Sequence, residues 1–340
     1  MTADFKDLIA HVADGNALSE AEAEAAFNVM MSGEATPSQM GAFLMALRVR
    51  GETVEELTGA ARVMRAKVLP IVAPPGAIDT CGTGGDAKGT YNVSTAVSFI
   101  IAACGVPVAK HGNRALSSKS GGADVLGVLG VNIDADMGLI QRALDEVGIT
   151  FLMAPRHHGA MRHVGPTRVE LGTRTIFNLL GPLSNPAGAK RQLMGIFAQD
   201  KIEAQAHVLN HLGTERAWIV HGSDGLDELT TTGESYVAEV KDGEVSTFIV
   251  SPEDAGLPRA KFEDLVGGSP EQNAEKMTAL FAGEQGAFRD IVLLNAAAAL
   301  IVADKASDLP AGVAMAADAL DSGAAGKKLA ELVTFTNGPA

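Results

Sequence analysis

The chain has few aromatic residues: one Trp, two Tyr and twelve Phe make up 4% of its 340 residues. Its interior must therefore be built mainly from the aliphatic side chains that supply most of the 46% hydrophobic content. This length allows a substantial core, in one large domain or in two unequal ones.

Positive charge is also in short supply, because 27 Lys and Arg face 41 Asp and Glu, which gives a net charge of −14. Nucleic acids are bound through broad basic surfaces, so this balance argues against nucleic acid as the main partner. A small phosphorylated ligand needs only a local cationic site and is compatible with an acidic chain.

Cysteines and long apolar runs are scarce as well. Cys81 and Cys104 form no CxxC pattern and no disulfide framework, as is typical of a reducing compartment. The longest apolar runs, 97–109 and 291–302, are shorter than the roughly 20 residues of a membrane-spanning helix. The first residues are acidic and lack an apolar signal core. We therefore expect a cytoplasmic protein with no membrane partner.

The first 70 residues carry the start signals of several helices. Thr36 followed by Pro37 is typical of an N-cap with proline at the first helical position. Residues 53–56, Thr-Val-Glu-Glu, fit a capping box. The proline-rich stretch 69–77 interrupts this pattern and predicts a domain boundary.

Beyond this break, short apolar segments alternate with helical ones. Strands are predicted at 77–80, 106–109, 149–153, 192–197 and 217–220, and a hairpin from 236–240 and 245–250. Helices are predicted at 93–104, 123–129, 137–147, 290–303 and 313–320. Such alternation predicts an α/β domain with right-handed crossovers and a mainly parallel sheet.

The stretch DTCGTGGDAKGTYNVSTA, residues 79–96, consists largely of glycine and hydroxyl residues between a predicted strand and a predicted helix. Open α/β sheets bind ligands at this edge. Glycines let the backbone approach a ligand, and the N–H groups of a loop and of a helix N-terminus bind anions. A tight strand–helix turn is the plainer interpretation, but the stretch as a whole favours an anion site.

Two phosphate motifs fit this stretch poorly. A P-loop requires a lysine where Thr90 stands. The dinucleotide fingerprint is met formally by Gly82, Gly84 and Ala87, but it calls for an acidic residue after the next strand. The basic segment 110–114 stands there instead.

Cations gather in a second loop, expected after the strand 106–109. Lys110, His111, Arg114 and Lys119 lie within ten residues, among glycines and serines. Loops that follow two adjacent strands face each other, so one would offer backbone donors and the other cations. This arrangement would suit a binding site for a ligand with several phosphates. The alternative is a basic turn exposed to solvent.

Two further segments carry candidate ligand groups. Asp227 and Glu228 lie in a glycine-containing loop and offer the oxygen ligands that Mg²⁺ prefers, although a solvated acidic turn explains them equally well. The segment 154–188 is unusually cationic and suits a carboxylate, which arginine binds with its bidentate fork. Its cations are Arg156, His157, His158, Arg162, His163, Arg168 and Arg174.

Taken together, these motifs resemble the anthranilate phosphoribosyltransferases. GTGGD, NVST, KHGNRALSSKSGGADVLGVLG and RTIFNLLGPLSNPA occur in that family's order and spacing, and the resemblance covers essentially the whole chain. It implies transfer of the phosphoribosyl group of phosphoribosyl pyrophosphate (PRPP) to the amine of anthranilate, in tryptophan biosynthesis, with Mg²⁺ as cofactor. It also implies a fold of the nucleoside phosphorylase and phosphoribosyltransferase type.

The resemblance further implies two domains and a homodimer formed through the helical domains. Residues 1–72, joined by part of 168–190, would form the helical domain, and residues 73–340 the α/β catalytic domain.

Site residues carry over from the family motifs position by position. The PRPP site would be lined by Gly82, Gly85, Asp86, Thr90, Asn92, Val93, Ser94, Thr95, Lys110, His111, Gly112, Asn113, Arg114, Ala115, Leu116, Ser117, Ser118 and Gly122. Mg²⁺ would be held by Ser94, Asp227 and Glu228, and anthranilate contacted by Gly82, Asn113 and Arg168. The chain departs from the family's usual residues at Ala87, Gly122, Gly159 and Val169, which bear on loop stiffness and the acceptor tunnel.

The implied reaction requires no general base, because the aryl amine of anthranilate is neutral at pH 7. Catalysis would rest on positioning and on stabilising the leaving diphosphate, with Lys110, Asn113 and Arg168 as the electrostatic site.

Three other readings remain. A pyrimidine nucleoside phosphorylase resembles this fold but carries a different glycine loop. A nucleic-acid-binding relative would have lost the metal carboxylates and gained basic surface. The interpretation as a dinucleotide-dependent oxidoreductase is suggested only by Gly82-Thr83-Gly84.

Overall fold

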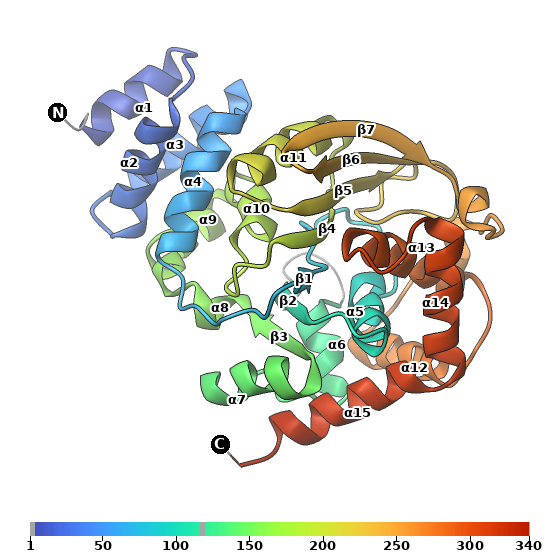
Figure 1. Ribbon diagram of the computed structural model, residues 1–340. Helices are drawn as coiled ribbons and strands as arrows, with labels where there is room; N and C mark the ends of the chain where they lie inside the picture. The colour runs from blue at the N-terminus through green and yellow to red at the C-terminus, as the bar shows by residue number, and fades with distance from the viewer. Residues whose placement is uncertain (1–3, 116–119, 340) are drawn as a thin grey trace.

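The structure is a computed structural model that describes residues 4–115 and 120–339 (Figure 1). Leu116, Ser117 and Ser118, which the resemblance assigns to the PRPP site, lie outside the described residues, as does Lys119. Within the described chain, no helix is both long enough and apolar enough to cross a membrane.

The chain begins with a bundle of four helices. They are α1 (Phe5–Ala13), α2 (Glu20–Met31), α3 (Pro37–Arg50) and α4 (Val54–Ala66). Thr36 and Gln39 form a capping box at the start of α3, and Thr53 and Glu56 form another at the start of α4. Both predicted helix starts are confirmed, because capping depends on residues close together in sequence.

A seven-stranded sheet forms the centre of the rest of the chain, in the order β3-β2-β1-β4-β5-β6-β7. The strands are β1 (Ile78–Asp79), β2 (Val108–Gly112), β3 (Ile149–Met153), β4 (Arg191–Gly195), β5 (Arg216–Gly222), β6 (Ser235–Lys241) and β7 (Glu244–Val250). Neighbours from β3 to β5 run parallel, and the hairpin β6–β7 adds an antiparallel edge. The predicted mainly parallel sheet is confirmed.

The other helices lie against the sheet, against the bundle or against one another. They are α5 (Val93–Ala103), α6 (Gly122–Val128), α7 (Met137–Arg142), α8 (Ala154–His157), α9 (Gly165–Leu171), α10 (Phe177–Leu180), α11 (Ile202–His211), α12 (Pro270–Phe281), α13 (Ala287–Val302), α14 (Leu309–Asp321) and α15 (Ala324–Thr336). Short turns are the π-helical η1 (Ala143–Val147) and the 3₁₀ turns η2 (Gly159–His163), η3 (Pro182–Ser184), η4 (Gln199–Lys201), η5 (Pro252–Ala255) and η6 (Phe262–Leu265).

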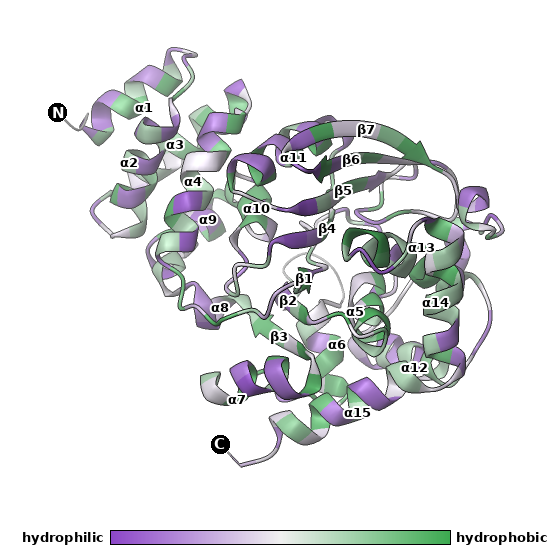
Figure 2. Ribbon diagram, viewed as in Figure 1, coloured by the Kyte–Doolittle hydropathy of each residue, from purple (hydrophilic) through white to green (hydrophobic). Residues whose placement is uncertain are grey.

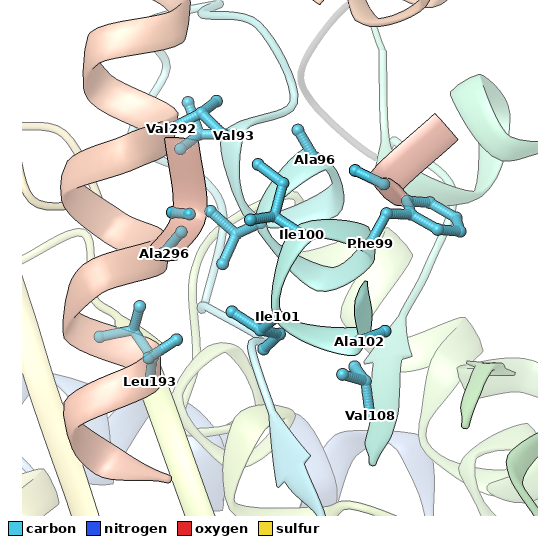
Figure 3. Packing of buried hydrophobic residues seen from close by; sticks show 14 of the residues in the cluster. Val93, Ala96, Phe99, Ile100, Ile101, Ala102, Val108, Leu193, Val292 and Ala296 are labelled. Carbon is cyan, nitrogen blue, oxygen red and sulfur yellow. The ribbon is translucent and has the colours of Figure 1, made fainter. Parts of the chain in front are cut away.

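One core packs α5 and α13 against the sheet. Figure 3 shows Ile100 of α5 and Ala296 of α13 in one cluster with Val108 of β2 and Leu193 of β4. Both helices are apolar on nearly every side, and α13 is mostly hydrophobic in Figure 2. This is the pattern of helices that are buried all round. Truncating Ile100 to alanine would cost about 2–5 kcal/mol of stability.

A second core joins the helical bundle to the other face of the sheet. It runs from Phe27 and Phe43 of the bundle through Phe177 of α10 to Met194 of β4 and Ile219 of β5. Figure 1 shows α9 and α10 between the bundle and the sheet. Residues far along the chain thus share the core of α1–α4. The division into 1–72 with part of 168–190, and 73–340, stays a prediction.

The structure corrects the predicted ends of two strands and one helix. β1 contains only Ile78 and Asp79, and β2 runs to Gly112 rather than stopping at residue 109. Lys110 and His111 therefore belong to a strand, not to the second loop, because β2 pairs in register with β3 up to Gly112. The predicted helix 137–147 changes from α-helix to a π-helical turn after Arg142.

Candidate active site

Two loops lie at the carboxyl edge of the sheet, where neighbouring parallel strands end. The segment 80–92 follows β1, and the described residues 113–115 and 120–121 follow β2 beside it. The chain leaves β1 towards β2 on one side, whereas β4 lies on its other side. Open α/β sheets bind ligands where the strand order reverses in this way.

The glycine-rich segment is fixed by its backbone. Thr83 N donates to Gly195 O at 2.8 Å, and Gly84 N donates to Asp227 Oδ2 at 2.7 Å. A Cβ on Gly82 would lie 3.0 Å from Asp227 Oδ2, so no larger residue fits there without displacement. Ala87, one of the expected departures from the family's usual residues, adopts a φ of +59°, which is uncommon for a residue with a side chain.

The first turn of α5 closes this segment. Ser94 N donates to Glu228 Oε1 at 3.2 Å. Asn92 accepts a hydrogen bond from Asn273 Nδ2 at 2.8 Å instead of capping the helix with its side chain. The side chains of Val93 and Thr95 are buried. The predicted contacts of these two residues with PRPP would therefore be made through their backbone.

Lys110 connects β2 with the segment after β1. Its side chain is buried, and its ammonium donates to Thr80 O and Thr80 Oγ1 at 3.3 Å each and to Ser94 Oγ at 3.4 Å. A cation at this depth beside the start of α5 adds positive charge to the helix N-terminus. The combination favours an anionic ligand at this edge of the sheet.

Three half-buried carboxylates lie together here: Asp86 belongs to the glycine-rich segment, and Asp227 and Glu228 lie against it. Burial, together with the charge of Asp86, raises the pKa of Asp227 to about 7. Burial and the charge of Asp227 raise the pKa of Glu228. Clustered carboxylate oxygens with mutual repulsion are the donor set that suits Mg²⁺. Because Asp227 and Glu228 bind loop backbone, the reading as a solvated acidic turn is wrong.

The loop after β2 is organised by an acidic residue that sequence reasoning missed. Asp124 accepts from Ala115 N at 2.9 Å and from Gly121 N at 3.0 Å, and its other oxygen lies 3.4 Å from Arg114 Nη1. Asn113 Oδ1 accepts from Arg114 N at 2.8 Å. The signal in the sequence was a carboxylate in the first turn of a predicted helix, as in a capping box.

The cationic segment 154–188 does not form one cluster. Arg156 donates to Ala135 O, and His157 Nδ1 lies 2.8 Å from Leu69 O. His158 Nε2 lies 3.2 Å from His111 Nε2, and burial lowers the pKa of His158 to about 4 and of His111 to about 3. Both rings are neutral at pH 7. The prediction that all seven cations act together on a carboxylate is therefore wrong.

Two arginines of that segment stack on aromatic rings. The Arg168 guanidinium lies 5.3 Å from the centre of the Phe177 ring, and burial lowers its pKa. Arg174 stacks on Phe197 at 4.1 Å and donates to Gly85 O in the glycine-rich segment. Sequence reasoning gave Arg174 no individual role, because its contact depends on a residue 89 positions away.

Below the two loops, Asp79 ends the short strand β1. Its carboxylate accepts from Cys81 N at 3.0 Å, from His111 N at 3.1 Å and from Asn185 Nδ2 at 2.7 Å. Burial raises the pKa of Asp79 to about 6, against the opposing effect of Lys110. Asp79, Cys81 and His111 bring ligand atoms within 4.8 Å of one another, as in a metal site. The three backbone and side-chain donors already satisfy the carboxylate, which explains the cluster without a metal.

Comparison with known proteins shows the class of protein to which this chain belongs. The glycosyl transferase family model for a helical bundle domain matches residues 6–68, and the one for an a/b domain matches residues 74–326. The anthranilate phosphoribosyltransferase of Azospirillum brasilense is 68% identical to this chain, over 98% of this chain and 94% of that protein. The protein of the same name from Rhodospirillum rubrum is 63% identical, over 99% of this chain and 97% of that protein. This chain belongs to the anthranilate phosphoribosyltransferase family of enzymes.

Solved structures agree with this assignment. Anthranilate phosphoribosyltransferase from Thermus thermophilus has a TM-score of 0.93 at 43% identity, over 98% of this chain and 100% of that chain. The Saccharomyces cerevisiae enzyme, in complex with PRPP and Mg, has a TM-score of 0.88 at 25% identity, over 97% of this chain and 98% of that chain. The predicted family and fold are confirmed.

Proposed function

We propose that this protein transfers the phosphoribosyl group of PRPP to the amine of anthranilate, giving N-(5-phosphoribosyl)anthranilate and diphosphate, as a step of tryptophan biosynthesis. The observation that carries the proposal is the meeting of a glycine-rich backbone, a buried lysine and a carboxylate cluster at one edge of the sheet. The proposal is further supported by the relatives of this chain, which are named anthranilate phosphoribosyltransferase.

The diphosphate of PRPP would lie between the two loops. The side chain of Lys110 and the backbone N–H groups of Gly82, Gly85, Asp86, Thr90, Asn92 and Thr95 would donate to its oxygens, with Asn113, Arg114 and Ala115 on the other side. The N–H groups of Thr83, Gly84 and Ser94 already bind Gly195, Asp227 and Glu228. As the bond from C1′ to diphosphate breaks, negative charge builds on the leaving group. Fixed donors in a partly buried site stabilise that charge without reorganising.

Mg²⁺ would be held by Asp227, Glu228 and Ser94, with Asp86 nearby. The fit rests on the half-buried carboxylates, whose mutual repulsion a divalent cation would relieve. When bound, the ion neutralises diphosphate charge. The yeast relative was solved with PRPP and Mg, which supports this assignment.

Anthranilate would bind with its carboxylate towards Arg168 and its ring beside Gly82 and Asn113. Its neutral amine would attack C1′ directly, and its surplus proton would leave to solvent or to a diphosphate oxygen after the bond forms. No residue need act as a general base before attack. The site would contribute by positioning the two substrates and excluding water.

A homodimer through the helical bundle is part of the proposal. Val49, at the end of α3, and Val169, in the neighbouring α9, are exposed large apolar side chains on this domain. Their burial against a second copy would remove both apolar side chains from water. Light scattering coupled to gel filtration should give twice the chain mass.

We also propose that the reaction takes place in the cytoplasm, where the free thiols Cys81 and Cys104 stay reduced.

The decisive experiment follows the intrinsic fluorescence of anthranilate. Purified protein, anthranilate, PRPP and Mg²⁺ together should consume anthranilate, and omission of any one should prevent it. Folded protein that leaves anthranilate unchanged in the complete mixture would refute the proposed acceptor.

A further inference from the structure

The strand that carries the glycine-rich segment is the shortest in the sheet described, yet it lies near its centre. β1 pairs with β2 only through Ile78 and Val108, and with β4 only through two residues. So short a run of strand pairing holds the backbone that follows β1 only weakly. Another interaction must hold the start of that segment against β2.

We infer that Asp79 and Asn185 are positioning residues that replace the missing ladder and hold Lys110 and Ser94 in place for the diphosphate of PRPP. Asp79 Oδ1 accepts from Cys81 N, at the start of the glycine-rich segment, and from His111 N in β2. One oxygen thus joins the backbone that leaves β1 to the neighbouring strand.

Asn185 adds a third segment to the same carboxylate. Its side-chain Nδ2 donates to Asp79 Oδ2 at 2.7 Å and to Ala109 O at 2.8 Å, and its Oδ1 accepts from Ala187 N at 2.8 Å. Asp79 is 1% exposed and Asn185 7%. All these groups are paired, so the network has one arrangement. A buried polar network satisfied in this way specifies geometry rather than merely adding stability.

The network lies directly below the groups that face the ligand. Thr80, between Asp79 and Cys81, presents the oxygens that orient the Lys110 ammonium, and that ammonium also reaches Ser94 Oγ. His111, whose N–H binds Asp79, follows Lys110 in the strand. A shift of the backbone at residues 79–81 would therefore move Lys110 relative to the first turn of α5. Asp79 would affect PRPP and Mg²⁺ through these residues without touching either.

The test is Asp79→Asn, which keeps the shape of the side chain and removes its charge. The Nδ2 of the new amide group would then face Asn185 Nδ2, so two hydrogen-bond donors would oppose each other. We expect the apparent KM for PRPP and the Mg²⁺ concentration at half activity to rise roughly 10–100-fold, the range of one lost charge-assisted hydrogen bond. The KM for anthranilate should change less than about twofold. A merely structural role would lower the folded fraction, and hence kcat, without moving these KM values.

Asn185→Ala gives a second, milder variant, with a smaller rise in the KM for PRPP. The double variant should be no worse than Asp79→Asn alone, because the opposed amides no longer meet. Losses that simply add would contradict the coupling.

Asp304→Asn is the matched control. Asp304 accepts from Arg191 at 2.5 Å and from Arg216 at 2.7 Å, at the amino ends of β4 and β5 on the opposite edge of the sheet. This variant should lower the melting temperature and leave the KM for PRPP unchanged. The same KM shift in Asp304→Asn and Asp79→Asn would overturn the inference.

This inference rests on the proposed function, and the two can fail separately. Wild-type protein without PRPP-dependent anthranilate consumption would refute the function. Active wild type with an unaltered KM for PRPP in Asp79→Asn would refute only the positioning role.

Discussion

At Asp227 and Glu228, the requirements of ligand binding oppose those of folding. Their raised pKa values mean that the protonated forms fit the free protein better than the ionised forms. The stability that Asp227 contributes is full below its ordinary pKa of 3.8 and is lost as the pH rises through about 7. Removing these charges should therefore stabilise the free protein while impairing its metal site.

The double variant Asp227→Asn/Glu228→Gln tests this opposition. At pH 7.5 its melting temperature without ligand should exceed that of the wild type by about 1–2 °C per kcal/mol regained. Its turnover should lose most of its Mg²⁺ dependence. Differential scanning fluorimetry from pH 5 to 8, with and without Mg²⁺ and PRPP, measures the first effect. A variant with unchanged metal dependence would remove both residues from the metal site.

Arg168 should act on the acceptor alone. Arg168→Ala should raise the KM for anthranilate about 10–100-fold, the value of a lost charge-assisted pair, with little effect on the KM for PRPP. Arg168→Lys should recover only part of the loss, because lysine lacks the bidentate fork. Steady-state kinetics with each substrate varied in turn separates the two. Equal changes for both substrates would contradict the assigned role.

At the scale of elements, the start of α6 packs closely against residues 114 and 115. Gly121 ends the loop, and an added Cβ would lie 2.4 Å from Ala115 N and 2.8 Å from the carbonyl carbon of Arg114. Gly127 lies six residues further on, inside α6, with nothing within 4 Å of an added Cβ. The two glycines thus make a matched pair.

Gly121→Ala should displace residues 114 and 115 and raise the KM for PRPP at least about fivefold, or about 1 kcal/mol. Gly127→Ala should leave that KM unchanged and stabilise the protein by about 0.5–1 kcal/mol, because alanine favours a helix. Kinetics and thermal melts on both variants test this pair. Equal KM values for the two would show that the loop before α6 does not contribute to PRPP binding.

For the whole molecule, the second core makes bundle and sheet interdependent. Phe27 of α2 and Phe177 of α10 lie 5.5 Å apart between ring centres, in the cluster that continues to β4 and β5. Neither the bundle nor the sheet can lose its half of this cluster without exposing apolar surface of the other. We therefore expect the chain to unfold in one step despite its two family models.

Leu180→Ala tests this coupling from a position in α10 that is fully buried. It should cost about 2–5 kcal/mol and lower the melting temperature while leaving a single calorimetric transition. Two separate transitions, of which the variant moves only one, would contradict a shared core.

The sequence alone determined the features that depend on neighbours along the chain. Thr36 and Thr53 start helices through partners three residues away, and the alternating apolar segments predicted the parallel sheet. The motifs after β1 and β2 predicted the enzyme family, which the comparisons confirmed.

Only the tertiary structure decided how buried polar groups are paired. Asp79 meets Asn185 from 106 residues away, and Gly84 meets Asp227 from 143 residues away. The same pairing placed Lys110 inside a strand and separated the cations of 154–188. A buried polar side chain must find a partner, but which one it finds depends on the strand order that brings distant segments together.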